Sequence, residues 1–286
     1  MRVATVQGRL GLQGPTGFVD VASASGGRFQ PDPQAVFDVW EEFTDWAHTY
    51  LGESDTPPAL PGDLELGPPV PRPRQVFAIG LNYAEHVGES GLAQPDSPAV
   101  FTKFPTCLAG PAESVRLPSE SVDWEVELVV AIGRRGERVS EEKAWEHVAG
   151  VTVGQDLSER AVQLAGPAPQ FSLGKSYPGF GPTGPVLVTP DELTDPDDLE
   201  LGCRIENGET LQLGRTGELI FGVPELIARL SAVCPLLPGD LIFTGTPSGV
   251  GMARKPPMFL KPGDVLVSWI DQIGELRNPL VAADAG

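Results

Sequence analysis

The chain of 286 residues has few cysteines and few histidines, and it lacks any long apolar run. Three cysteines and three histidines, all widely separated, fit neither a zinc-ligand spacing nor a disulfide framework. We therefore expect reduced thiols, a cytoplasmic location and a metal site built from carboxylates rather than histidines. No segment approaches the roughly 20 apolar residues that span a bilayer, and the first residues lack a signal-peptide core.

Basic residues are also scarce: the chain has 20 lysines and arginines and 39 aspartates and glutamates, which gives a net charge of -19. Such a charge repels nucleic acids and anionic membrane surfaces, so neither is expected as a partner. An anionic substrate stays open, because a bound cation can reverse the field at one site. The 30 prolines and 34 glycines are spread along the chain, which indicates many short strands joined by turns.

The order of patterns predicts an α+β, β-rich fold in two domains. Residues 1–30 alternate as in a small sheet, and residues 34–51 carry apolar side chains at helical spacing. Residues 56–74 are proline-rich and cannot pair as a central strand, so they predict a linker. We therefore predict a small N-terminal α+β domain over residues 1–72 and a larger, β-rich catalytic domain over residues 73–286.

Three local signals are clear inside the larger domain. Residues 76–80 form a short apolar run that predicts a buried strand. Asn207-Gly208, between two alternating runs, predicts a tight hairpin. Residues 224–233 have the spacing of a short amphipathic helix.

Two glutamates, Glu125 and Glu127, stand at the head of an apolar run, Leu128–Ile132, that ends at a glycine. The run predicts a strand, in which residues two apart point to the same face. Two carboxylates side by side on a partly buried face repel each other, and a hard divalent cation relieves that repulsion. Asp156 follows a second strand pattern, where its carboxylate can join as a third ligand. The alternative is an ordinary solvated strand face.

His86 and Glu89 follow the strand predicted at residues 76–80 and lie three residues apart. One helical turn would make them neighbours. A carboxylate that orients an imidazole gives a general base able to take a proton from water. The alternative is a surface ion pair on a solvated helix.

Other polar residues are candidates for contact with an anionic substrate. Lys103 lies in an apolar run and Lys175 in a glycine-rich loop, in a chain with only five lysines. A lysine among apolar residues usually has a partner, although snorkelling to the surface is the alternative. Arg160 and Gln163 follow Asp156 at helical spacing, suited to a carboxylate or a carbonyl group.

The glycine-rich run over residues 245–251, which includes Thr246, superficially resembles a phosphate-binding loop. It lacks the lysine of such a loop and no helix pattern follows, so a nucleotide site is rejected. Its backbone N–H groups and the Thr246 hydroxyl remain suited to a carboxylate.

The order and spacing of these motifs resemble the fumarylacetoacetate hydrolase family over roughly residues 75–280. The matching runs are Asn82-Tyr83-x-x-His86-x-x-Glu89, Phe101-x-Lys103, Asp123-x-Glu125-x-Glu127-Leu128, Gln155-Asp156-x-Ser158-x-Arg160, Gly174-Lys175-Ser176 and Thr244-Gly245-Thr246-Pro247-x-Gly249-Val250-Gly251. The resemblance implies a mixed β-roll or β-sandwich catalytic domain, often dimeric, that binds Mg²⁺ or Mn²⁺. The stretch before residue 72 resembles the small N-terminal domain of many bacterial members.

The resemblance also implies roles for the candidate residues. These are metal ligands (Glu125, Glu127 and Asp156), a water-activating dyad carried on a lid (His86 and Glu89), a lysine beside the metal (Lys175) and contacts to substrate oxygens (Arg160, Gln163 and Thr246), with Lys103 added from its apolar setting. The main reaction implied is hydrolysis of a carbon–carbon bond in a 2,4-dioxo acid through a metal-stabilised pyruvate enolate.

Two alternative reactions use the same enolate. One is decarboxylation of oxaloacetate, and the other is isomerisation or decarboxylation of unsaturated dioxo-diacids, such as 2-hydroxyhepta-2,4-diene-1,7-dioate, from aromatic catabolism. A different class of function is a metal-dependent binding protein without turnover. The expected partners are a small dioxo acid and a second copy of the chain in a homodimer.

Overall fold

The computed structural model describes residues 1–53, 64–90 and 95–283; residues 54–63 of the region around the predicted linker lie outside the described residues. Strands dominate, and the predicted α+β, β-rich fold is confirmed. The helices and 3₁₀ turns are α1 (Val21–Ala24), η1 (Ala35–Val39), α2 (Trp40–Glu53), α3 (Ala84–Ser90), η2 (Pro105–Cys107), η3 (Glu141–His147), α4 (Arg160–Gln163), α5 (Phe171–Gly174), η4 (Pro190–Glu192), η5 (Thr216–Glu218), α6 (Val223–Ser231) and η6 (Gly251–Ala253). The strands are β1 (Arg2–Val6), β2 (Arg9–Gly14), β3 (Gly17–Asp20), β4 (Leu66–Gly67), β5 (Val76–Gly80), β6 (Ala99–Thr102), β7 (Leu108–Ala109), β8 (Val115–Leu117), β9 (Val122–Asp123), β10 (Val126–Ile132), β11 (Val148–Gln155), β12 (Ser158–Glu159), β13 (Gly181–Val188), β14 (Glu200–Ile205), β15 (Thr210–Arg215), β16 (Leu241–Phe243), β17 (Val265–Ile270) and β18 (Gly274–Ala282).

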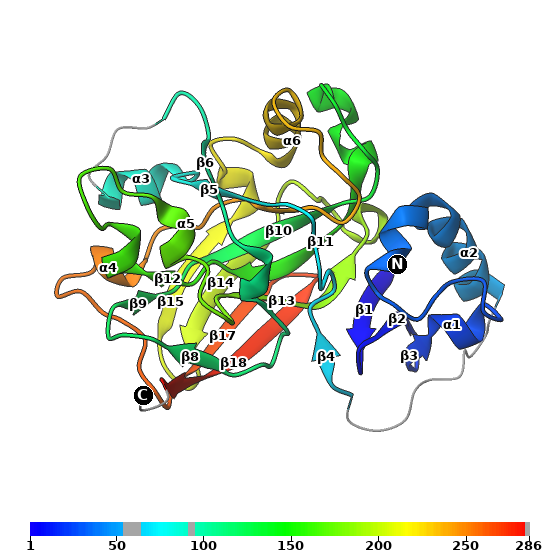
Figure 1. Cartoon of the computed structure of the whole chain (residues 1–286), viewed down its shortest axis with the longest axis horizontal. Helices are drawn as coiled ribbons and strands as arrows, with labels where there is room; N and C mark the ends of the chain where they lie inside the picture. Colours follow the sequence, from blue (N-terminus) through cyan, green and yellow to red (C-terminus); the bar gives the residue numbers. More distant parts are fainter. Residues whose placement is uncertain (54–63, 91–94, 284–286) are drawn as a thin grey trace.

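The main sheet of the described residues has the strand order β3-β2-β1-β13-β11-β10-β16-β5-β6, with β4 paired to β1 and β7 to β13. Its N-terminal strands join it because β1 pairs antiparallel with β13. Figure 1 shows these strands and helix α2 gathered at one end of the molecule. The two predicted domains therefore share a sheet, and the boundary near residue 72 stays a prediction.

A second sheet, in the order β15-β14-β17-β18-β8, packs on one face of the main sheet. Strand β10 is buried along its whole length because its alternate side chains enter two different cores. Leu128 and Val130 enter the core between the sheets, whereas Val129 and Ala131 enter the core on the outer face. By the same alternation, Glu127 belongs to the outer face with Val129.

Helix α2 and turn η1 supply much of the outer core. Phe43 and Ala47 of this helix are completely buried, and Trp40 stacks on Phe37 with ring centroids 5.2 Å apart. The helix predicted over residues 34–51 is therefore confirmed, except that it begins as a 3₁₀ turn. No described helix is long and apolar enough to cross a membrane.

The local signals of the larger domain are confirmed. Strand β5 covers the predicted residues 76–80, and helix α6 lies within a residue or two of its predicted bounds. Strands β14 and β15 pair antiparallel around Asn207, whose φ of 59° is the left-handed conformation that such a turn requires.

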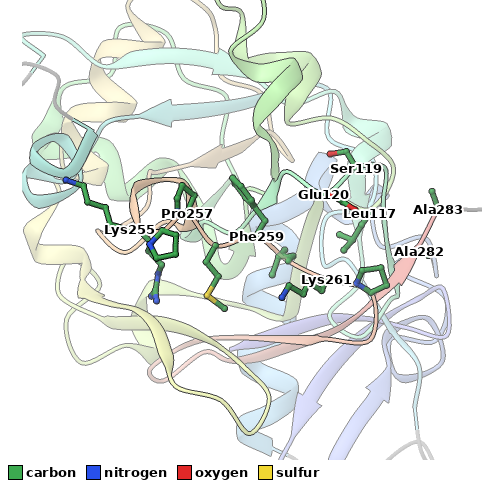
Figure 2. Close-up of a pocket in the computed structure, with 14 residues that line it drawn as sticks. Leu117, Ser119, Glu120, Lys255, Pro257, Phe259, Lys261, Ala282 and Ala283 are labelled. Atoms are coloured by element: carbon green, nitrogen blue, oxygen red, sulfur yellow. The ribbon is translucent and has the colours of Figure 1, made fainter.

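A wide groove of about 1160 Å³ lies along the segment that leads into β17. Figure 2 shows residues from Lys255 to Lys261 on one side of the groove and Ala282 and Ala283 at its far end. Glu120 is the one carboxylate among the described residues that line it. The groove therefore does not offer the carboxylate cluster expected for a divalent ion.

Candidate metal centre and active site

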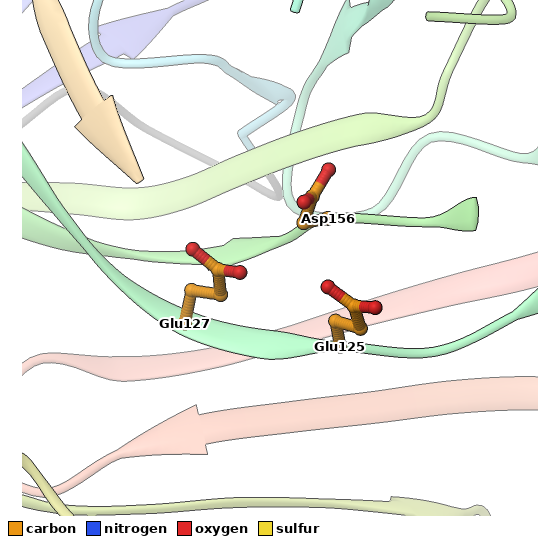
Figure 3. Close-up of side chains that lie close together, drawn as sticks. All are labelled: Glu125, Glu127 and Asp156. Atoms are coloured by element: carbon orange, nitrogen blue, oxygen red, sulfur yellow. The ribbon is translucent and has the colours of Figure 1, made fainter. Parts of the chain in front are cut away.

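Strand pairing brings three carboxylates together. In the register between β10 and β11, Val126 lies opposite Gln155, and the Asp156 N–H donates to the Glu125 carbonyl oxygen over 2.8 Å. Glu125 and Glu127 flank Val126, and one oxygen from each of the three carboxylates lies within 4.8 Å of the others. Figure 3 shows Glu127 of β10 and Glu125, just before this strand, pointing toward Asp156. The structure thus brings together the three residues that the sequence grouped.

Three buried cations surround this carboxylate cluster. Lys175 Nζ lies 2.6 Å from Glu125 Oε2 and 2.6 Å from Asp156 Oδ2. Arg160 Nη1 lies 2.8 Å from Glu125 Oε1, and Lys103 Nζ lies 2.7 Å from Asp156 Oδ1. All five residues are buried, so these ion pairs are poorly screened by solvent.

The pKa values of the two glutamates are shifted in opposite directions. Burial alone would raise the pKa of Glu125, but Lys175 and then Arg160 outweigh it and lower the pKa to about 2. Burial raises the pKa of Glu127 well above its ordinary value, and the neighbouring Asp156 and Glu125 carboxylates add to the effect. The raised pKa means that Glu127 favours its neutral form unless a cation offsets the neighbouring negative charges. Three buried carboxylates so close together fit a divalent ion such as Mg²⁺ or Mn²⁺, which prefers oxygen ligands.

His86 and Glu89 lie together on helix α3, with His86 Nδ1 2.7 Å from Glu89 Oε1. Burial alone would raise the pKa of Glu89, but hydrogen bonds from His86 and the Gly249 N–H outweigh it and lower that pKa. An ionised Glu89 favours a proton on Nδ1, so Nε2 is the basic nitrogen of the neutral imidazole. The dyad predicted from the sequence has the geometry of a general base.

Asn82 anchors the start of the helix that carries the dyad. Its completely buried amide donates to the carbonyl oxygens of Phe221 and Thr244, over 3.0 and 2.7 Å, and accepts from the Phe221 N–H over 2.8 Å. The preceding Leu81 has a φ of 57°, which turns the chain sharply between β5 and α3. These contacts fix where His86 enters the site.

A cavity of about 270 Å³ connects the dyad with the carboxylate cluster. The predicted site residues that line it are His86, Glu125, Arg160, Gln163, Lys175 and Thr246. Glu127 and Asp156 are almost completely buried and are not among its described lining residues. A substrate in this cavity would meet the base and the polar residues at once.

Lys103 lies in a different place from the one expected. We expected contact with substrate, but its fully buried ammonium donates to Asp156, to the Lys175 carbonyl oxygen and to the Phe180 carbonyl oxygen. These acceptors account for its three N–H groups, and Lys103 is not among the described residues that line the cavity. Its position suits the support of Asp156 rather than a direct contact with a ligand.

The glycine-rich run over residues 245–251 does bind carboxylates, but they belong to the protein. The backbone N–H donors and their acceptors are Gly245 with Glu127 (2.8 Å), Gly249 with Glu89 (3.0 Å) and Gly251 with Asp123 (2.7 Å). The Thr246 hydroxyl donates to the Val126 carbonyl oxygen over 2.9 Å. One loop therefore contacts both the carboxylate cluster and the dyad.

Asp123 is a buried residue to which the sequence gave no role. Its carboxylate accepts hydrogen bonds from Arg160 and from the N–H groups of Trp124, Gly251 and Met252. It thereby fixes the guanidinium that contacts the cluster. Its place two residues before the Glu-x-Glu pair was a sequence signal, because the same spacing repeats, although Asp123 ends β9 and β10 begins only at Val126.

Two buried glutamines were missed as well. Gln155 Oε1 accepts from the Glu125 N–H over 2.8 Å, and Gln212 Oε1 accepts from the Val126 N–H over 3.0 Å. The Gln212 side chain also donates to the Thr246 hydroxyl over 2.8 Å. These amides fix the backbone that carries the cluster, and no spacing in the sequence marks them for that task.

Known proteins resemble this chain over most of its length. The family model described as fumarylacetoacetate (FAA) hydrolase, C-terminal, matches residues 75–281. The mitochondrial oxaloacetate tautomerase FAHD2A of Bos taurus is 44% identical over 227 residues, which make up 78% of this chain and 72% of that protein.

Two solved structures resemble the whole chain. The crystal structure of a Mycobacterium smegmatis protein provisionally named HpcE is 57% identical, with a TM-score of 0.94 over 99% of this chain and 100% of that chain. Maleylpyruvate hydrolase from Sphingobium sp. SYK-6, in complex with manganese (II) ion and pyruvate, is 28% identical, with a TM-score of 0.80 over 99% of this chain and 100% of that chain.

Proposed function

Because the chain belongs to the fumarylacetoacetate hydrolase family, we propose that it is a divalent-metal-dependent enzyme that hydrolyses a carbon–carbon bond in a small 2,4-dioxo acid. One observation carries the proposal: His86, which pairs with Glu89, lines the same cavity as Glu125 and Lys175. A general base and a carboxylate cluster that share one cavity are what metal-assisted hydrolysis requires.

Glu125, Glu127 and Asp156 would hold the ion, for which the family and the carboxylate donors indicate Mg²⁺ or Mn²⁺. When bound, the ion supplies Lewis-acid stabilisation of negative charge on the substrate oxygens. The manganese in the related maleylpyruvate hydrolase supports a divalent ion here.

The chain's own residues supply the rest of the reaction. His86, oriented by Glu89, takes a proton from water, and the resulting hydroxide attacks the C4 carbonyl of the substrate. The bond between C3 and C4 then breaks; C4 leaves as a carboxylic acid and C3 takes a proton to complete pyruvate. Lys175 lies beside two cluster carboxylates and offers positive charge where negative charge develops. Arg160, Gln163 and Thr246 line the cavity and would orient substrate oxygens.

The second candidate is tautomerisation of oxaloacetate, which the identity with FAHD2A of Bos taurus favours. In that reaction His86 would move a proton between C3 and the C2 oxygen, and no water would be consumed. Decarboxylation of oxaloacetate and isomerisation of unsaturated dioxo-diacids would use the same active-site residues, with the reaction steps in a different order. A binding protein without turnover would need the same ion but would form no product.

The test mixes purified protein with acetylpyruvate and, separately, with oxaloacetate, each with Mg²⁺ or with EDTA. Equal amounts of acetate and pyruvate from acetylpyruvate, abolished by EDTA, are the expected result. Faster keto–enol exchange of oxaloacetate without acetylpyruvate cleavage would replace hydrolysis by tautomerisation. If pyruvate forms only from oxaloacetate, the proposed reaction changes from hydrolysis to decarboxylation.

A homodimer in the cytoplasm belongs to the same proposal. The family resemblance predicts the dimer, and the scattered cysteines predict the reducing compartment. Light scattering on the metal-loaded protein measures its mass in solution. The mass of two chains is expected, and the mass of one chain would contradict the dimer.

A further inference from the structure

The cavity beside the cluster is lined by both charged and apolar residues. Its cations are Arg160 and Lys175, with His86 close by, and these three are the basic residues among its described lining. The apolar lining residues are Phe101, Leu164, Phe171, Val250 and Met252. A ligand in this cavity would therefore meet both polar groups and apolar surface, which adjoin where Lys175 Nζ lies 5.2 Å from the centroid of the Phe101 ring.

The two cavity cations are already bound to protein carboxylates. Lys175 contacts Glu125 and Asp156, at 2.6 Å each. Arg160 contacts Asp123, Glu125 and the Gln163 side chain. Neither has its charge to spare for a second anionic group on the ligand.

The net charge of the cluster and its neighbours also argues against a second carboxylate on the ligand. The three cluster carboxylates and Asp123 are four buried negative groups, and they outnumber the adjoining cations Lys103, Arg160 and Lys175 by one. A bound divalent ion turns this deficit into one net positive charge. One carboxylate on a ligand balances that charge, and a second one would be left without a partner.

The apolar lining is formed by side chains from separate elements. Phe101 of β6 and Phe171 of α5 meet edge to face, with ring centroids 5.6 Å apart. Leu164, after α4, is 45% exposed, and Met252, in η6, is 36% exposed. These apolar surfaces would gain by covering an apolar group. A carboxylate placed there would lose hydration, and the nearby Lys175 ammonium, which lies over the Phe101 ring, is already paired with Glu125 and Asp156.

We propose that the group beyond C4 of the substrate is apolar, an alkyl or aryl chain, and not a second carboxylate. This inference rests on the proposed function for the position of the 2-oxo acid head beside the cluster. The Phe101–Phe171 pair, with Leu164 and Met252, is then the surface that selects the acyl group.

Binding of two ligands that cannot be cleaved tests the inference. They are 2-oxoadipate and 6-methyl-2-oxoheptanoate, in which an isopropyl group replaces the distal carboxylate; neither has the 4-oxo group that hydrolysis attacks. With Mg²⁺ present, calorimetry should give a dissociation constant about tenfold or more lower for the isopropyl compound. Equal or tighter binding of 2-oxoadipate would overturn the inference.

Two matched variants make the test specific to the cavity. Leu164→Arg adds a cation to the apolar lining and should shrink or reverse the preference, whereas Leu213→Arg adds one to exposed strand β15 and should leave it unchanged. An unchanged preference in Leu164→Arg would overturn the role of this surface.

If the isopropyl preference holds while acetylpyruvate is not cleaved, the hydrolase proposal fails and the inference stands. If neither ligand binds, the inference fails, whether or not acetylpyruvate is cleaved.

Discussion

Arg160 holds Asp123 through two nitrogens, with Nε 2.9 Å and Nη2 2.7 Å from the same carboxylate oxygen, in a pair with almost no solvent exposure. The carboxylate also accepts two N–H groups of the loop that follows β16. The cavity's arginine is therefore fixed by Asp123, which is not among the described residues that line the cavity.

We predict that Asp123→Asn lowers the free energy of unfolding by about 3–5 kcal/mol, because it leaves the buried Arg160 charge with less compensation. Urea denaturation measures the change. Asp198→Asn, which breaks an exposed pair with Arg215, is the matched control and should have a much smaller effect. Equal effects of the two substitutions would contradict the assigned importance of the buried pair.

Lys175→Met should destabilise the metal-free protein strongly, by about 3–5 kcal/mol, because Glu125 and Asp156 lose the ammonium that both contact. A divalent ion supplies positive charge at the same carboxylates, so Mg²⁺ should recover more stability in this variant than in the wild type. Thermal unfolding with and without Mg²⁺ measures both effects. Exposed Lys143→Met is the control. Equal recovery in both variants would mean that Lys175 does not share its partners with the ion.

Glu127→Gln should remove the stabilisation by metal without harming the metal-free fold. The raised pKa of Glu127 means that the metal-free site already favours a neutral side chain, which glutamine imitates. In the wild type, an ion at a hundred times its dissociation constant should add about 2.7 kcal/mol of stability. The variant should show none of this increase in a melting experiment. Glu209→Gln, at an exposed side chain, should keep it all.

Ion binding should release a proton and strengthen as the pH rises. Glu127 has a raised pKa in the fold, so its contribution to metal-free stability is complete below its unfolded pKa and is lost as pH rises through the folded value. A divalent ion competes with that proton. Calorimetric titration with Mg²⁺ in two buffers of different ionisation enthalpy should give different heats at mildly acidic pH. Identical heats would show that no proton leaves.

His86→Ala should lower kcat by roughly 10²–10⁴-fold, the usual contribution of a general base, while the affinity for Mg²⁺ hardly changes. Glu89→Gln should fall between this variant and the wild type, since it keeps the imidazole but removes the charge that orients it. His48→Ala, at a half-exposed histidine paired with Asp191, is the control. Full turnover in His86→Ala would remove the dyad from the mechanism.

Patterns confined to one strand or one helix were predictable from the sequence. The two-residue spacing of Glu125 and Glu127 and the three-residue spacing of His86 and Glu89 follow from strand and helix geometry alone. The helix over residues 34–51 and the Asn207-Gly208 turn were found in the same way.

Contacts between distant segments were not predictable, because spacing says nothing about which partner a buried polar group finds. Lys103 illustrates the difficulty: its apolar setting correctly indicated a partner, but the partners are Asp156 and two carbonyl oxygens rather than a ligand. Gln155 and Gln212 look like ordinary strand residues until the fold places them against unpaired backbone N–H groups.

The loop over residues 245–251 has a consequence for anyone who wishes to re-engineer the protein. Its three bonds to Glu127, Glu89 and Asp123 come from backbone N–H groups, which no side-chain substitution can delete or tune. Gly245 and Gly249 have φ values of 106° and 104°, and a Cβ on Gly251 would collide with the Met258 carbonyl oxygen. In a saturation library this loop would tolerate few replacements, so changes of specificity should be sought in the parts of the cavity wall outside it, such as Leu164 and Phe171.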